Sequence, residues 1–250
     1  DTAPTSRLTS YSGPHYSAQA DVLMGVNAFF VGPGGYDVSP HAAITDTCVT
    51  CHMSESEFGE GYGDHTWTIG EEICASCHGE GVSGEAIKAT VEARLHDVET
   101  AIAAAVVGDV ADVITAATDT VVVRAWDEAT DCYSSSSSSS STVPLAAAPT
   151  AASETHIHGQ TGFCFTMPSA VTWTRACTGC SGNVTSTEVC FQVGSLKLGT
   201  AGTAIISTTD PVIKAAWNAS LIGSDGSGGI HNPVWALDVL RATSEALLAR

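Results

Sequence analysis

Two short stretches of the chain each hold a pair of cysteines separated by two residues and directly followed by a histidine: CVTCH at residues 48–52 and CASCH at residues 74–78. CxxCH is the pattern that attaches a c-type haem. The two thiols form thioether bonds to the haem vinyl groups, and the histidine binds the iron as its proximal axial ligand. The pattern predicts two c-type haems, attached through Cys48, Cys51, Cys74 and Cys77 and ligated by His52 and His78.

One zinc ion bound by the same four cysteines is the alternative, because their spacing is tolerable for a zinc site. A zinc ribbon does not require a histidine after each cysteine pair, however, and here both pairs have one. Haem attachment is therefore favoured. The two patterns begin 26 residues apart, which predicts haems that lie close together.

Two haem irons need two further axial ligands to become six-coordinate. The candidates are His15, His41, His65 and His231, with Met24, Met53 and Met167 as weaker alternatives. An iron with both axial positions filled passes electrons and does not bind a substrate. Paired imidazoles also give lower potentials than a histidine–methionine pair.

Four stretches resemble the framework of multihaem cytochromes c: HAAITDTCVTCHM, DHTW, CASCHG and DGSGGIHNPVWALDVL. Similar stretches occur in the last two-thirds of pentahaem nitrite reductases and in exported multihaem proteins of metal-respiring microbes. The resemblance covers about residues 10–100 and 205–248 and leaves out the region between them. The lysine-ligated open haem of those reductases has no counterpart, because the chain contains no CxxCK.

The resemblance also implies distal ligands. His231 would bind the haem of His52. His41 would bind the haem of His78. His65 and then His15 are left as alternatives, or as ligands to a haem in a neighbouring subunit.

The composition excludes some function classes. The chain has 27 acidic and nine basic residues among 250, a formal charge of −18, which argues against nucleic acid because such binding needs cationic side chains. No apolar run is long enough to span a bilayer. The first residues, DTAPTS, are typical of a mature end exposed after cleavage. Together with nine cysteines, they predict an exported protein that is periplasmic, extracellular or at the cell surface.

The sequence predicts an α+β fold with three parts. Residues 1–118 would be a largely coil and helical dihaem region, with an amphipathic helix that Ser83 begins. Residues 119–205 would be a β-rich insertion with a flexible serine-rich tether that starts at Ser134. Residues 206–250 would complete the haem domain with two helices.

Local patterns also predict the finer elements of the second and third parts. Short strands are expected in TVVVRAW, GFCFT, AVTWT, EVCFQV and SLKLG. Asp210 and Asn232, each followed by proline, would cap the last two helices, which end at Gly223 and near Leu248. Disulfides are expected among the remaining cysteines, Cys132, Cys164, Cys177, Cys180 and Cys190, of which one is left over.

These features predict an electron carrier and not an enzyme. Its partners would be redox proteins or extracellular electron acceptors. It could also polymerise into a filament with haems stacked across subunits, because non-closing contacts form filaments. The alternatives are a dihaem peroxidase or oxyanion reductase with one open iron, and a binding module in which the β-rich insertion recognises a surface or a glycan.

Overall fold

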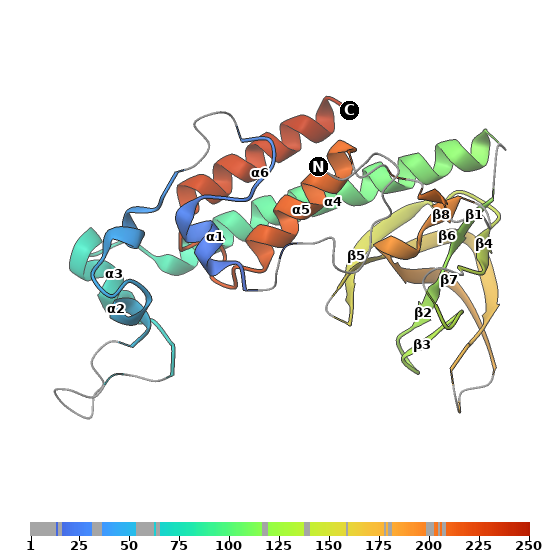
Figure 1. Cartoon of the computed structure of the whole chain (residues 1–250), viewed down its shortest axis with the longest axis horizontal. Coiled ribbons are helices and arrows are strands. Elements are labelled where there is room, and N and C mark those ends of the chain that lie inside the picture. The colour runs from blue at the N-terminus through green and yellow to red at the C-terminus, as the bar shows by residue number, and fades with distance from the viewer. Residues whose placement is uncertain are drawn as a thin grey trace. The chain divides into compact units, whose positions relative to one another are not determined.

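The computed structural model describes residues 14, 17–31, 37–53, 63, 66–116, 120–137, 141–158, 160–177, 179, 182–198, 203–204, 206 and 209–250. Helices and antiparallel strands both occur, so the α+β prediction is confirmed at that level (Figure 1). The helical elements are α1 Gln19–Met24, the 3-10 helix η1 Pro40–Ala43, α2 Cys48–His52, α3 Glu71–His78, α4 Gly84–Thr115, the 3-10 helix η2 Val193–Ser195, α5 Pro211–Gly223 and α6 Pro233–Leu248. The strands are β1 Val121–Val123, β2 Ala125–Asp127, β3 Cys132–Tyr133, β4 Val143–Leu145, β5 Ala151–Ile157, β6 Gln160–Thr174, β7 Asn183–Gln192, β8 Lys197–Leu198 and β9 Thr203–Ala204.

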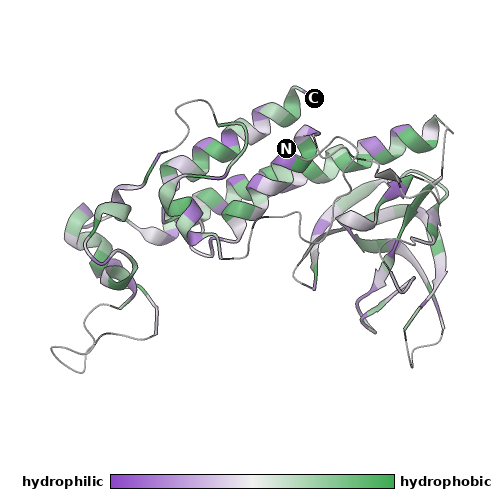
Figure 2. Ribbon diagram, in the orientation of Figure 1, coloured by the Kyte–Doolittle hydropathy of each residue, from purple (hydrophilic) through white to green (hydrophobic). Residues whose placement is uncertain are grey.

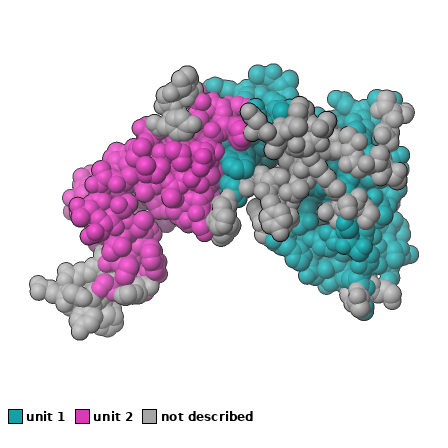
Figure 3. Space-filling model, viewed as in Figure 1, with its two compact units in different colours: residues 1–14, 97–220, 244–250 teal, residues 15–96, 221–243 magenta. Residues whose placement is uncertain are grey.

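The chain divides into two compact units (Figure 3). Unit 1 consists of residues 1–14, 97–220 and 244–250, and unit 2 consists of residues 15–96 and 221–243. Both CxxCH patterns and His231 belong to unit 2, whereas all the strands belong to unit 1.

Unit 1 contains two antiparallel sheets, with strand orders β4-β1-β8-β9 and β3-β2-β7-β6-β5. The predicted strand TVVVRAW is divided at Arg124, so that β1 joins the first sheet and β2 the second. The guanidinium of Arg124 lies 3.6 Å from the centroid of the Tyr133 ring. Its Nε also donates to the carbonyl of Ser135 over 2.8 Å. These contacts fix the point at which the chain changes sheets.

The two predicted strands GFCFT and AVTWT form one long strand, β6. Its register with β7 shifts between Thr166 and Val171. Pro168 lies in that interval, and proline cannot donate a hydrogen bond to a neighbouring strand. A bulge or similar irregularity in the pairing is therefore expected here. It allows β6 to pair with β7 on both sides of the proline.

Alternating apolar positions on β6 and β7 form the core of unit 1. Phe165 and Phe191 are fully buried, and their rings pack edge to face with centroids 4.7 Å apart. Figure 2 shows the same mixture of apolar and polar positions along the strands and along helices α5 and α6.

Two disulfides lie in unit 1. Cys164 and Cys190 are directly opposite each other on β6 and β7, and Cys132 is bonded to Cys177. The expectation of disulfides is confirmed, and the structure supplies the pairing. Cys180 lies outside the described residues.

The serine-rich tether prediction is wrong for its described residues. Ser141 is buried and donates to the carbonyl of Ser195 over 2.7 Å. The backbone N–H of Ala125 donates to Oγ of Ser134 over 2.9 Å. Strand β4 follows directly and pairs with β1. Serine hydroxyls here satisfy backbone groups between strands, a role that composition does not reveal.

The predicted helix signals are confirmed. The N–H of Ala86 donates to Oγ of Ser83 at the start of α4, and the N–H of Val212 donates to Asp210 at the start of α5. The N–H of Trp235 donates to Oδ1 of Asn232 at the start of α6. Helices α5 and α6 end at Gly223 and Leu248. Within the described residues, no helix has the length and apolar character needed to cross a membrane.

Glu154 on β5 gives a prediction about pH. Burial and the nearby Glu99 raise the pKa of its carboxyl to about 7, from 4.5. At pH values between 4.5 and 7 this carboxyl keeps its proton in the folded state and loses it on unfolding. The free energy of unfolding therefore falls as the pH rises through this range. We expect Glu154→Gln to raise the free energy of unfolding by about 2 kcal/mol at pH 8.

Urea unfolding at several pH values measures this effect. The gain should shrink as the pH is lowered towards 5. Glu188→Gln on β7, in the same sheet, is the control, because that side chain is exposed. An equal gain at pH 5 and pH 8 would show that the carboxyl charge is not the cause.

Candidate functional site

The two CxxCH patterns both lie on short helices of unit 2. Residues 48–52 form the whole of α2, and residues 74–78 form the end of α3. Positions i and i+3 of a helix lie on the same face, so the two thiols of each pair project together. All four thiols are free.

The four thiols share one neighbourhood. Burial raises the pKa of the Cys51 thiol, and the thiols of Cys74, Cys77 and Cys48 raise it further. A tetrahedral zinc site would hold its sulfurs about 4 Å apart. Within the described part of the chain, the only three potential metal-binding side chains with atoms within 4.8 Å of one another are Cys164, Glu188 and Cys190, and the two cysteines are joined in a disulfide. The free thiols are therefore not arranged as the zinc cluster considered above.

Four histidines come together as two pairs. The rings of His52 and His231 have centroids 6.2 Å apart and planes inclined by 54°. The rings of His41 and His78 have centroids 5.9 Å apart and planes inclined by 88°. Each pair joins the histidine of one CxxCH pattern to a histidine from another segment. These are the pairs that the resemblance implied as axial ligands.

Hydrogen bonds fix the orientation of the first pair. Nδ1 of His52 lies 3.1 Å from the carbonyl oxygen of Trp67. A carbonyl can only accept, so this Nδ1 carries the proton, and Nε2 of the neutral ring keeps a free lone pair. Nδ1 of His231 lies 2.5 Å from Oδ1 of Asp225. Metal-binding histidines usually donate their second N–H to a carbonyl or carboxylate in this way.

A glycine-rich loop positions His231. In DGSGGIH, Gly228 and Gly229 have φ of 63° and 81°, which favours glycine. A side chain on Gly229 would also come within 2.9 Å of Val91 on α4. The loop thus lies directly against α4, and the cap at Asn232 follows at once.

Asn232 also links the segments that carry His231 and His41. Its Nδ2 donates to the carbonyl of Asp37 over 2.6 Å. Two residues further on, Ser39 is buried and its Oγ accepts the N–H of His41 over 3.3 Å. One buried asparagine therefore fixes the backbone beside both distal candidates.

Exposed apolar side chains gather in unit 2. Of the nine large apolar residues that are exposed in the described chain, only Leu248 belongs to unit 1. The others are Met24, Phe29, Val38, Val49, Trp67, Ile69, Val82 and Val234. Trp67 is 55% exposed, and its ring lies 5.3 Å from that of His52. The Trp67 ring could therefore contact an apolar, planar ligand bound by His52.

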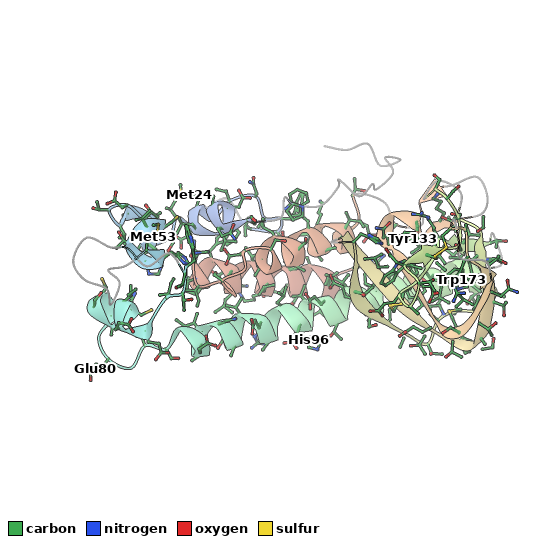
Figure 4. The ribbon with its side chains drawn as sticks, turned by 90° about the horizontal axis from the view of Figure 1, so that it is seen from below. Met24, Met53, Glu80, His96, Tyr133 and Trp173 are labelled. Carbon is green, nitrogen blue, oxygen red and sulfur yellow. A yellow bond between two sulfur atoms is a disulfide. The ribbon has the colours of Figure 1, made fainter. Side chains whose placement is uncertain are left out.

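The remaining candidate ligands are less well placed or not described. Met167 is buried in β6 of unit 1. Met24 is the last residue of α1, and Met53 directly follows α2 (Figure 4). His15 and His65 lie outside the described residues. Sequence reasoning missed Asp225, six residues before His231, because only the fold of the glycine loop brings the two together.

Comparisons with known proteins gave no match among protein-family models, curated proteins or solved structures.

Asn232 gives a testable prediction. Asn232→Ala removes the cap of α6 and the hydrogen bond from this buried side chain to the carbonyl of Asp37. We expect a loss of about 2 kcal/mol in the free energy of unfolding, measured by chemical denaturation. Arg241→Ala, an exposed change on the same helix, should change stability by less than about 0.5 kcal/mol. Equal effects of the two changes would contradict the proposed role of Asn232.

Proposed function

We propose that this protein is an exported dihaem c-type cytochrome that transfers electrons through two neighbouring haems, each ligated by two histidines. The attachment cysteines are Cys48 and Cys51 on α2, and Cys74 and Cys77 on α3. The axial pairs are His52 with His231, and His78 with His41.

The separation of the paired rings carries this proposal. A metal–imidazole bond is about 2 Å long and a ring nitrogen lies about 1 Å from the ring centroid, so two axial imidazoles on one metal ion have centroids about 6 Å apart. The observed separations are 6.2 and 5.9 Å. Rings that share one axis can take any angle about it, so inclinations of 54° and 88° are both compatible with ligation.

The surrounding side chains fit the same group. A haem is large, flat and mostly apolar, and the exposed apolar residues of the described chain gather almost entirely in unit 2. When bound, haem supplies reversible one-electron chemistry at its iron. The chain's own part is to attach it through the thiols, to hold both imidazoles with Nε2 towards the metal, and to exclude water with the apolar side chains.

An electron carrier is favoured over an enzyme because both histidine pairs are already opposed. An enzyme of the peroxidase or oxyanion reductase type needs one iron with an open position. Two disulfides in unit 1 are compatible with an exported protein. The partners would then be redox proteins or extracellular electron acceptors, or further copies of the chain in a filament.

An absorption spectrum with a haem count tests the proposal first. We expect two covalently bound, low-spin haems per chain whose Soret band does not shift when carbon monoxide is added to the reduced protein. One shifted haem would support the enzyme alternative. A protein purified with zinc and no haem would refute both.

Single substitutions test the ligand pairing. His231→Ala and His41→Ala should each open one iron, so that one of the two haems binds carbon monoxide. His96→Ala is the matched control, because this histidine is exposed on α4 (Figure 4), and both of its haems should stay closed. If His231→Ala leaves both haems closed, His65 or His15 is the distal ligand instead.

A further inference from the structure

Asp225 is a buried carboxylate in direct contact with a candidate axial ligand. Its side chain has no exposed surface, while that of His231 is 24% exposed. Oδ1 lies 2.5 Å from Nδ1 of His231. Oδ2 accepts from Oγ of Ser227 and, over 3.3 Å, from the N–H of Gly229. Donors on both oxygens are what a buried carboxylate requires.

The loop is built around this carboxylate. Ser227 donates to Asp225 and its Oγ also accepts the N–H of His231 over 3.3 Å. The imidazole is thus held through both its ring and its backbone. The sequence DGSGGIH supplies each of these groups within seven residues.

The two histidine pairs differ in this respect. His52 donates to a neutral carbonyl, that of Trp67, and His231 faces an acidic side chain. Neither ring of the His41–His78 pair makes a hydrogen bond to another residue in the described ranges. Among the described residues, therefore, only the His52–His231 pair has a carboxylate bonded to a ring nitrogen.

We propose that Asp225 is a positioning residue that fixes His231 with Nε2 free and lowers the reduction potential of the haem bound by His52 and His231, relative to the haem bound by His41 and His78. This inference rests on the proposed function. A charge-assisted hydrogen bond to Nδ1 makes the imidazole a stronger electron donor. A stronger donor stabilises the ferric state, which carries one more positive charge than the ferrous state. The buried negative charge acts in the same direction.

The consequence is an order of reduction. When both haems are bound, the first electron to enter the chain would reside mainly on the haem held by His41 and His78, and the haem held by His52 and His231 would be reduced second. Transfer between them would oxidise one iron and reduce the other by one electron, with no proton required.

Asp225→Asn tests the inference in the haem-loaded protein. Asparagine can still accept from Nδ1 but has no charge. The midpoint potentials are measured in a redox titration followed by absorbance and by electron paramagnetic resonance. We expect one of them to rise by at least about 59 mV, which is a tenfold change in the equilibrium constant for one-electron reduction. The g values of that haem should change and those of the other should not.

Asp21→Asn is the matched control. Asp21 is also an acid of unit 2, but its side chain accepts from Asn27 over 2.9 Å and not from a histidine. Asp21→Asn should change each midpoint potential by no more than a few tenths of the rise expected for Asp225→Asn. If Asp225→Asn changes neither midpoint potential, or changes both by similar amounts, the inference is wrong. Conversion of one haem alone to the high-spin form would support it, since His231 then needs the carboxylate to stay bound.

A second measurement needs no substitution, in case Asp225→Asn does not fold. In the unaltered ferric protein, the ring N–H of His231 should exchange slowly with D₂O, because it is bonded to a buried carboxylate. Exchange as fast as that of an exposed imidazole would overturn the inference. Failure of the proposed function looks different, because no low-spin haem would then be found in the unaltered protein.

Discussion

Unit 2 has to position its functional groups on elements that have almost no apolar core of their own. Helices α2 and α3 and the 3-10 helix η1 carry all four free thiols and three of the four paired histidines, yet none of these elements contains a buried residue. Isolated helices of five and eight residues are not stable in water. Their placement depends on polar contacts such as that between Asn232 and Asp37, and on the opposed histidine rings. Under the proposed function the haems supply the missing core, so folding of this region is coupled to their attachment.

Unit 1, in contrast, holds its strands in place with an apolar core and disulfides. Its sheets enclose Phe165 and Phe191, and disulfides join β6 to β7 and Cys132 to Cys177. Unit 1 is stabilised by buried apolar surface and covalent cross-links. In the described part of unit 2 the buried apolar side chains lie on α1, α4, α5 and α6 or directly before α1, among them Val22, Val91 and Trp235, and η1, α2 and α3 contain none. All but one of the exposed large apolar residues of the described chain belong to unit 2.

The sequence predicted what short-range chemistry decides. The caps at Ser83, Asp210 and Asn232 could be predicted from the sequence, because each depends on one side chain and a backbone N–H two or three residues away. The sequence could not predict that β6 continues through Pro168, or how the cysteines pair, because both depend on which strands become neighbours. The contact between Asp225 and His231 was hidden for the same reason. The described serines of a tract that looks flexible by composition are ordered, because backbone groups on adjacent strands need their hydroxyls.

The chain holds two chemically distinct sets of cysteines, and this contrast bears on the cofactor. In unit 1 the paired cysteines are oxidised to disulfides, which form and persist in an oxidising compartment. In unit 2 four thiols lie in one neighbourhood and are free. Thiols that lie close together in such a compartment tend to oxidise, and Cys48 and Cys77 are exposed. Under the proposed function, a thioether bond to haem would use each sulfur permanently and so keep all four cysteines out of disulfides. The same proposal accounts for the histidine after each pair, whose ring centroid lies 6.2 or 5.9 Å from that of a second imidazole.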